Sequence, residues 1–381
     1  MKNNGWPIRI LELRSVWGSG GGPDKTILLG TYRSDPKRYL VTACYIRDAR
    51  DPNYGIESRP ERKNIDYVEV VEQNSFDIKI LRQLRTLVRD RCIQVIHSHD
   101  YKTDLLAWLL SIGTGVIPLS TAHGWSGHSW KELKVYYPLD RQILRLFHRV
   151  IAVSKDIKKM LSDAGVRPEK ILVIPNGIDQ DLYRKDPALT PRIRSELGIG
   201  PGQIAIGAVG RLEAEKNYPL LLKAFSDVLE RSIDAKLIIA GDGSLKCELL
   251  NLANELKLGE RCCFLGQVSD VRRLHHAMNM LVMCSDNEGS PNTVLEAMAL
   301  GTPVIATDVG GLSDMVRPSI DGLLIPKRNK SALVEAITGI VEKPAEAGRR
   351  AQSACLRVEQ EFTFDARMRR VESVYCDLMS N

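Results

Sequence analysis

Residues 285–304 read SDNEGSPNTVLEAMALGTPV and follow an apolar run from Asn279 to Cys284. Ser290 followed by Pro291 predicts a helix N-cap with proline at the first helical position. The amides of that helix's first turn would lie at the end of a buried strand. There the helix dipole and the unpaired N–H groups favour a phosphate. The stretch therefore predicts an α/β protein with a phosphate-binding site.

Two carboxylates flank this predicted site. Glu288 lies in the loop before the cap, and Glu296 lies in the second turn of the helix. A carboxylate beside a diphosphate would be repelled unless it faced neutral hydroxyls. We therefore expect the two residues to have different partners, one a sugar and the other a ribose.

The segment as a whole resembles a known signature. Glu288 and Glu296 are followed by Ala297-Met298-Ala299, Gly301-Thr302-Pro303-Val304 and Asp308-Val309-Gly310-Gly311. This pattern is similar to that of the family-4 retaining glycosyltransferases of the GT-B fold, glycosyltransferase group 1. The resemblance implies two Rossmann-like domains facing a central cleft, with donor nucleotide on the second and acceptor on the first. Many members carry an aromatic or aliphatic residue after Glu-Gly, so the Ser290 seen here leaves the donor sugar open.

Short apolar runs alternate with helical patterns, as in parallel sheets covered by helices. Residues 175–179, Pro-Asn-Gly-Ile-Asp, interrupt the alternation and predict a hinge, which family members often carry at this junction. We expect an acceptor-side domain over 1–175, a donor domain over 176–363, and a C-terminal helix over 364–381 that packs back on the first domain. The predicted strands are 8–13, 39–45, 66–70, 92–97, 116–119, 150–153, 171–174, 204–209, 236–240, 261–265, 279–284, 304–306 and 322–325.

The composition is that of an ordinary globular protein. Of 381 residues, 44% are hydrophobic and 26% are charged. The eight cysteines include no Cys-x-x-Cys pair, which favours free thiols in a reducing compartment. The N-terminus has no apolar signal region, and the uncharged stretch 105–122 is interrupted by Gly113, Gly115 and Pro118. We expect a cytoplasmic protein without a membrane span.

The net charge of +6 is unevenly distributed, because residues 1–185 hold 30 Lys and Arg against 21 Asp and Glu. This asymmetry favours a polyanionic acceptor or an anionic membrane surface, whereas no nucleic-acid motif is present. Arg141, Arg145 and Arg149 recur on one side of a helix predicted within 125–150, with Leu139, Ile143, Leu146, Phe147 and Val150 on the other. Upstream lie Trp125, Trp130, Lys131, Lys134, Tyr136 and Tyr137, which suit a lipid interface. A peripheral enzyme acting on a lipid-linked or polysaccharide precursor is one interpretation, and a helix with one buried face is the other.

Cations are predicted on the donor side. Arg211 and Lys216 follow the first strand of the second domain, and the resemblance implies that they stabilise the diphosphate leaving group. Local pairing of these cations with Glu213 or Glu215 is the alternative. The other donor-side candidates are Gly21, Gly22, Gly210, Gly241, Gly243, Gly289, Ser290, Asn292, Thr293 and Glu296. Gly21 and Gly22 belong to a glycine loop after the first strand, where a dinucleotide site or a plain tight turn are the alternatives.

Three histidines follow predicted strands of the first domain. The resemblance implies that His123 contacts the transferred sugar, with Glu288, Arg211 and Lys216 as its catalytic partners. His97, His99 and Asp100 are acceptor-side candidates. Their spacing also permits a metal, but Asp100 would be a weak third ligand. Asp179-x-Asp181 is formally a metal-binding motif, yet it lies in the hinge, so we expect no metal and no cofactor besides the nucleoside-diphosphate sugar.

The expected reaction is hexosyl transfer from a nucleoside-diphosphate sugar to a lipid-linked or saccharide acceptor. By resemblance the anomeric configuration is retained. A nucleotide-sugar epimerase of the same fold is the enzymatic alternative. A two-domain sugar-binding protein without activity is the other.

Overall fold

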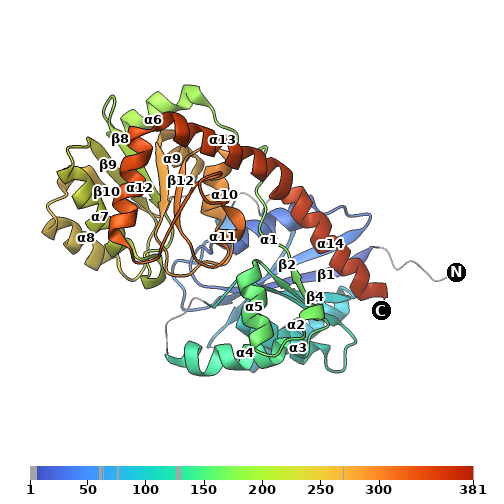
Figure 1. The fold of residues 1–381 in the computed structure, drawn as a ribbon. Coiled ribbons are helices and arrows are strands. Elements are labelled where there is room, and N and C mark those ends of the chain that lie inside the picture. Colours follow the sequence, from blue (N-terminus) through green and yellow to red (C-terminus); the bar gives the residue numbers. More distant parts are fainter. Residues whose placement is uncertain are drawn as a thin grey trace. The chain divides into compact units, whose positions relative to one another are not determined.

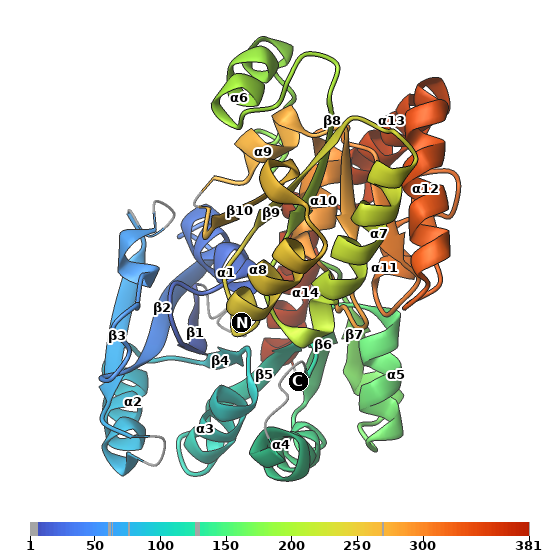
Figure 2. The ribbon, with the colours of Figure 1, turned by 90° about the vertical axis from the view of Figure 1, so that its left-hand side faces the viewer.

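A computed structural model describes residues 7–59, 62, 64–74, 77–125, 130–268 and 270–380. The chain forms two compact units. The first comprises residues 1–175 together with 367–381, and the second comprises residues 176–366. Each unit is built on one parallel β-sheet (Figures 1 and 2).

The sheet of the first unit has the strand order β3-β2-β1-β4-β5-β6-β7, which can be followed in Figure 2. All of its strand pairs are parallel. The strands are β1 (Ile8–Val16), β2 (Tyr39–Asp48), β3 (Asp66–Glu72), β4 (Val95–Ser98), β5 (Ile117–Ala122), β6 (Arg149–Ala152) and β7 (Ile171–Val173).

Helices connect these strands. They are α1 (Gly22–Arg33), α2 (Ile78–Asp90), α3 (Tyr101–Ser111), a π-helical turn (Glu132–Tyr136) that continues into α4 (Tyr137–Leu144), α5 (Lys155–Asp163) and the C-terminal α14 (Phe364–Ser380). The apolar face of α14 carries Val371, Val374 and Tyr375, which pack against Ile8 and Ile10 of β1. Burial of this face attaches the C-terminal helix to the first sheet.

The sheet of the second unit has the order β10-β9-β8-β11-β12-β13, and its pairs are also parallel. Its strands are β8 (Ile204–Val209), β9 (Ala235–Ala240), β10 (Cys262–Gly266), β11 (Met280–Met283), β12 (Val304–Thr307) and β13 (Leu323–Ile325). Its helices are α6 (Thr190–Glu196), α7 (Tyr218–Glu230), α8 (Lys246–Glu255), α9 (Arg272–Ala277), α10 (Asn292–Ala299), α11 (Leu312–Met315), α12 (Lys330–Glu342) and α13 (Pro344–Glu361).

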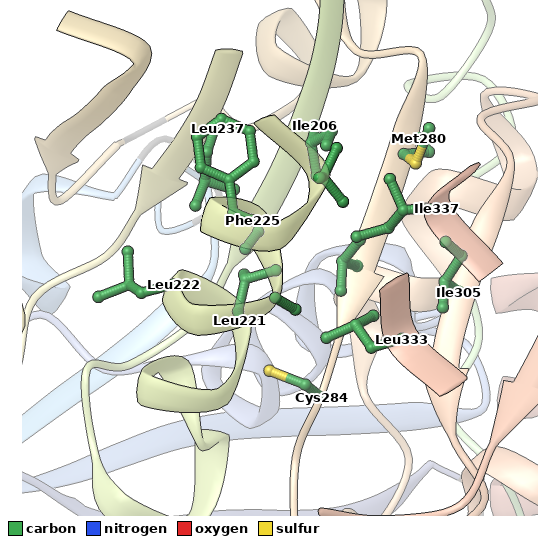
Figure 3. Packing of buried hydrophobic residues seen from close by; sticks show 14 of the residues in the cluster. Ile206, Leu221, Leu222, Phe225, Leu237, Met280, Cys284, Ile305, Leu333 and Ile337 are labelled. Atoms are coloured by element: carbon green, nitrogen blue, oxygen red, sulfur yellow. The ribbon is translucent and has the colours of Figure 1, made fainter. Parts of the chain in front are cut away.

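Helices cover both faces of this second sheet. Successive residues of a strand point to opposite faces, so a strand that is apolar throughout needs helices on both sides to bury its side chains. In β11, Met280 and Val282 pack in the cluster that contains Phe225 of α7 (Figure 3). The alternate residues Leu281 and Met283 pack with α10 and α13. Complete burial of each such side chain stabilises the fold by about 1.5–3 kcal/mol.

The two sheets share a strand order of the doubly wound type. Each begins in the middle, grows outward to one edge, and then returns to add strands on the other side of its first strand. The order reverses between β1 and β4 in the first unit and between β8 and β11 in the second. In such sheets ligands bind outside the carboxyl ends of the strands at this switch point.

All thirteen strands expected from the sequence are present, and the Rossmann-like fold of both sheets is confirmed. The helix expected within 125–150 is wrong in its extent, because α4 ends at Leu144 and Arg149 begins β6. Two residues expected on its buried side, Leu139 and Leu146, are 47% and 57% exposed. Apolar residues recur beyond the end of α4 because the chain then enters the buried strand β6.

Candidate functional site

Glu288 lies in the loop after β11, beyond the switch point of the second sheet. Its Oε1 atom is 2.5 Å from Nζ of Lys216 and 2.6 Å from the Ser285 hydroxyl. The Lys216 and Glu288 side chains are 16% and 8% exposed, so their charges are largely removed from water. Both contacts use Oε1, which leaves Oε2 of Glu288 able to accept a further hydrogen bond.

Backbone contacts fix the Glu288 loop. The Thr307 hydroxyl donates to the carbonyl of Ser285 at 2.6 Å, and the Gly311 amide donates to the carbonyl of Glu288 at 3.1 Å. Gly310 has a positive φ of 52°, and a Cβ there would lie 2.0 Å from the same Glu288 carbonyl oxygen. The glycine is therefore required for close approach of the two loops.

Glu296 has a separate partner. It lies on α10, is 2% exposed, and accepts a hydrogen bond from the Tyr183 hydroxyl at 2.9 Å. Burial and the adjacent Glu296 raise the pKa of Tyr183, so the phenol stays protonated as a donor. Within the protein the two glutamates contact different side chains, and their sugar and ribose contacts stay predictions. Tyr183 was missed in the sequence, although it lies four residues after the hinge residue Asp179.

The predicted N-cap at Ser290 is wrong. Helix α10 begins at Asn292, with Thr293 next, and the capping position is Pro291. Ser290 instead accepts a hydrogen bond from the Asn176 amide at 3.2 Å, and its carbonyl accepts one from the Asn176 side chain at 2.8 Å. The hinge segment has taken the hydroxyl that would otherwise cap the helix.

Arg211 and Lys216 have different environments. Arg211 is 62% exposed, and its guanidinium donates to Oε1 of Glu215 at 2.7 Å, so the local pairing considered from the sequence exists. Glu213, the other local candidate, accepts hydrogen bonds from the backbone amide and hydroxyl of Ser244. Lys216 instead pairs with Glu288. The Glu215 side chain is 6% exposed, so a phosphate would have to share the exposed Arg211 guanidinium with this buried carboxylate.

The donor-side glycines allow neighbouring loops to approach each other. A Cβ at Gly241 would lie 1.8 Å from the Gly210 carbonyl oxygen, and one at Gly243 would lie 2.6 Å from that of Leu212. The loops after β8 and β9 are therefore in backbone contact. Gly289 follows Glu288 and is partly buried.

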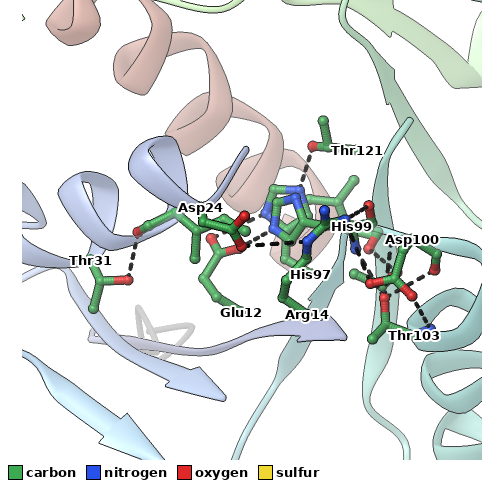
Figure 4. A network of polar contacts seen from close by, with 12 residues as sticks. Glu12, Arg14, Asp24, Thr31, His97, His99, Asp100, Thr103 and Thr121 are labelled. Atoms are coloured by element: carbon green, nitrogen blue, oxygen red, sulfur yellow. Dashed lines mark hydrogen bonds and ion pairs between the residues drawn. The ribbon is translucent and has the colours of Figure 1, made fainter. Parts of the chain in front are cut away.

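A cluster of histidines lies at the carboxyl ends of β1, β4 and β5 in the first unit (Figure 4). His99 Nε2 is 2.5 Å from Oε2 of Glu12, and His99 Nδ1 is 3.3 Å from His123 Nε2. His97 contacts Tyr375 and Thr121, each at 2.7 Å. His123, which is partly buried, is thus the outermost member of a connected network.

The acceptor-side candidates are largely occupied within the protein. His97 and His99 are 1% and 4% exposed, and both nitrogens of each ring have a partner, so they are poorly placed to contact an acceptor. Asp100 caps helix α3 by accepting from the Lys102 and Thr103 amides. Its other oxygen accepts from the Ser15 amide at 2.9 Å. The geometry favours contacts within the protein, and not with an acceptor, for these three residues.

The glycine loop lies after β1, as expected, and leads into α1. Gly21 precedes α1, and Gly22 begins it. The positive φ values fall instead on Gly18 and Gly20, at 74° and 72°, and a Cβ at Gly20 would lie 2.5 Å from the Asp24 carboxylate. The Asp24 carboxylate accepts the Gly21 amide at 2.6 Å, which fixes the turn.

Among the described residues, one group of potential metal ligands has its ligand atoms within 4.8 Å of one another: Glu12, His97 and His99. It does not include Asp100. The hinge residues Asp179 and Asp181 are outside that group, and the Asp181 carboxylate pairs with Arg184 at 3.1 Å.

A cavity of about 870 Å³ lies in the second unit, away from these residues. It is lined by residues at the amino ends of the strands, including Ile204, Met280 and Pro303, and by α13. Because ligands of doubly wound sheets bind at the carboxyl ends, we do not regard it as the donor site.

Two family models match the chain. Residues 190–355 match the model described as "Glycosyl transferases group 1", and residues 42–182 match "Glycosyltransferase Family 4". The UDP-Gal:alpha-D-GlcNAc-diphosphoundecaprenol alpha-1,3-galactosyltransferase of Escherichia coli is 26% identical over 315 residues, covering 80% of this chain and 81% of the relative. A D-inositol 3-phosphate glycosyltransferase of Rhodococcus erythropolis is 31% identical, covering 68% of this chain and 64% of the relative.

Solved structures have the same fold. Anabaena HepE in complex with UDP and glucose superposes with a TM-score of 0.84 at 20% identity, covering 97% of this chain and all of that one. Sucrose-phosphate synthase from Thermosynechococcus elongatus gives a TM-score of 0.84 at 22% identity, covering 98% and 99%. Among the described residues, no helix is long and apolar enough to cross a bilayer.

Proposed function

Because the chain belongs to the group 1 glycosyltransferases of the GT-B fold, which move a sugar from a nucleotide sugar, we propose that it is a retaining hexosyltransferase. The observation that carries this proposal is the buried Lys216–Glu288 pair at the switch point of the second sheet. It provides a cation for a diphosphate and a carboxylate oxygen for a sugar hydroxyl in one place.

The donor would bind as follows. Lys216 and Arg211, together with the first-turn amides of α10, hold the diphosphate and stabilise the charge that grows on it as the glycosidic bond breaks. Glu296, oriented by Tyr183, accepts hydrogen bonds from the ribose hydroxyls. Oε2 of Glu288 accepts one from the sugar. On the first unit we assign His123 to contact with a substrate sugar.

Retention follows if the leaving diphosphate oxygen takes the proton of the attacking acceptor hydroxyl on the same face of the sugar. In that mechanism no separate carboxylate base is required. Proton NMR of the first product formed distinguishes the outcomes. An anomeric coupling that matches the donor supports retention, and an inverted one refutes it.

The donor is proposed to be a UDP-hexose, because the E. coli relative is named for UDP-Gal and HepE was solved with UDP-glucose. Thermal unfolding with UDP, ADP and GDP sugars tests this, since a ligand that binds only the folded state raises the transition temperature. Stabilisation by a GDP sugar alone would refute the choice of base. Conversion of the donor sugar without any acceptor would instead indicate an epimerase, and binding without turnover would indicate a sugar-binding protein.

The proposed acceptor is a lipid-linked saccharide, as in polysaccharide or glycolipid precursor synthesis. The segment 130–146 carries five exposed apolar side chains, those of Trp130, Leu133, Val135, Leu139 and Leu146, which are 45–70% exposed. Lys131 and Lys134 lie among them in the sequence and are also exposed. Of the other residues expected at this interface, Tyr137 is 6% exposed and Trp125 is partly buried, with its indole donating to Asp140 at 2.9 Å.

Exposed apolar side chains with cations between them suit an anionic membrane surface. The protein should cosediment with anionic liposomes at low salt and be released as salt rises. Trp130→Ala should weaken this binding, whereas Trp17→Ala, which removes a tryptophan of 61% exposure outside the segment 130–146, should not. Equal recovery in the supernatant with anionic and neutral liposomes would refute membrane association.

We also propose that transfer needs no divalent metal, because cations and helix amides compensate the diphosphate charge. Activity should persist in EDTA. A complete loss that Mg²⁺ restores would revive Asp179 and Asp181 as ligands.

A further inference from the structure

Three side chains of the first unit form a continuous hydrogen-bonded line. It runs from Glu12 on β1, through His99 after β4, to His123 after β5. Figure 4 shows its first two members, Glu12 and His99. Glu12 stands opposite His97 in the strand register, at the switch point of this sheet. The inner members are buried, at 9% for Glu12 and 4% for His99, while His123 is partly exposed.

The position of Glu12 is fixed by a second set of contacts. The Tyr375 hydroxyl donates to Oε1 of Glu12 at 2.8 Å, so both carboxylate oxygens are occupied. Because the Tyr375 hydroxyl donates its hydrogen bond to Glu12, its oxygen can accept a hydrogen bond from Nδ1–H of His97. His97 Nε2 then accepts a hydrogen bond from the Thr121 hydroxyl. The buried guanidinium of Arg367 supplies a countercharge to Glu12.

The protonation states determine which group donates and which accepts in each hydrogen bond of this line. Burial lowers the pKa of His99 to about 4 and also lowers that of His123, so both rings are neutral near pH 7. Burial opposes ionisation of Glu12, yet His97 and His99 hold its pKa well below the usual range. An ionised carboxylate can only accept, so His99 must carry its proton on Nε2. His99 Nδ1 is then an acceptor, and His123 must donate to it from Nε2.

We propose that Glu12 and His99 are positioning residues that fix His123 with its proton on Nε2 and a bare Nδ1, which accepts a hydrogen bond from a substrate hydroxyl. This inference rests on the proposed function, in which His123 contacts a sugar. A His123 protonated on Nδ1 would present a donor in place of the acceptor that this contact requires. The same Glu12, His97 and His99 atoms could instead hold a metal, but their mutual hydrogen bonds and Arg367 favour the metal-free arrangement.

The first test does not depend on activity. NMR of the protein labelled with ¹⁵N-histidine reports which ring nitrogen is protonated. At pH 7 we expect His123 as the Nε2–H form in the wild type. Glu12→Gln should shift it toward Nδ1–H, because the amide can donate to His99 and reverse the line. An unchanged His123 signal in Glu12→Gln, or an Nδ1–H signal in the wild type, would overturn the proposal even if no sugar transfer were found.

The second test is a double-mutant cycle on transfer kinetics. Glu12→Gln and His99→Gln should each lower kcat by about 10–100-fold, the loss that follows when residues that orient metal-ligating histidines are replaced. Neither should change the affinity for UDP, whose proposed contacts are on the second unit. In a His123→Ala background the same changes should have little further effect, because they act through that ring.

The matched control is Thr121→Val. It removes a buried hydrogen bond to His97 but does not touch the line to His123, so kcat should stay near the wild-type value. An equal loss of kcat in Thr121→Val, or an undiminished Glu12→Gln effect in the His123→Ala background, would indicate a structural role only. Stoichiometric zinc in the purified protein, with loss of activity on chelation, would also overturn the proposal. Wild-type activity in His123→Ala would instead refute the sugar contact in the proposed function.

Discussion

Removing the Lys216 ammonium should destabilise the second unit by about 3 kcal/mol. Its Nζ is 2.5 Å from the Glu288 carboxylate, and exposed fractions of 16% and 8% show that little water could replace the lost partner. Lys216→Met keeps the aliphatic stem but leaves the carboxylate with the Ser285 hydroxyl as its remaining contact. Breaking one side of a buried ion pair costs about 3–5 kcal/mol, and the residual exposure of Lys216 favours the low end.

The double variant Lys216→Met/Glu288→Gln should recover most of this loss, because a neutral amide no longer needs a cation. Urea unfolding of the wild type, both single variants and the double variant gives the coupling energy, which should exceed about 1.5 kcal/mol. Arg192→Met is the control: it breaks an exposed pair with Glu196 and should change stability by at most about 0.5 kcal/mol. A Lys216→Met loss no larger than the control's would refute the buried pair. Sugar transfer should fall in all three variants, including the restabilised one.

Three further outcomes follow from single residues. Burial lowers the pKa of His99 from an ordinary 6.5 to about 4. Between pH 6.5 and pH 4 the unfolded chain therefore binds a proton at His99 that the folded chain does not bind. The free energy of unfolding should fall by about 1.4 kcal/mol for each pH unit as the pH drops through this range. His99→Gln should flatten that slope in urea unfolding at pH 7 and 5, and an unchanged slope would contradict it. Tyr183→Phe removes the donor to Glu296 and should weaken UDP binding about tenfold in calorimetric titration; unaltered affinity would show that the hydroxyl is irrelevant. Gly310→Ala should lower the free energy of unfolding by more than about 2 kcal/mol, because the added Cβ would lie 2.0 Å from a backbone oxygen. The control Gly339→Ala, which has open space around its Cβ in helix α12, should be neutral or stabilising. Equal effects of the two substitutions would refute the steric argument.

The sequence predicted features whose causes are local. Strands follow from short apolar runs. Glu288 and Glu296 could be assigned different positions because one precedes a helix and the other lies within it. The Ser290 cap failed because a distant amide, that of Asn176, took the hydroxyl. Asp100 was assigned to an acceptor although its position just before a helix also suits a cap. Local patterns cannot choose between two partners for one polar group when one of them comes from another part of the chain.

Glu12 illustrates the same limit most clearly. Its alternation within β1 gives no indication of function, and its partners His99 and Tyr375 are 87 and 363 residues away in the sequence. Only the strand order, which places β1 beside β4, and the return of α14 bring them together.

Each unit has a buried glutamate near the switch point of its sheet, Glu12 within β1 and Glu288 in the loop after β11. In each, the strand order reverses beside the first strand, and a buried carboxylate lies near that point with a nitrogen donor at 2.5 Å: His99 for Glu12 and Lys216 for Glu288. The chemistry differs with the donor. A lysine is a full charge that can be shared with an incoming diphosphate, whereas a neutral imidazole transmits only the direction of a hydrogen bond. The same strand order thus supports a charge-binding site on one unit and, in our proposal, an oriented acceptor on the other.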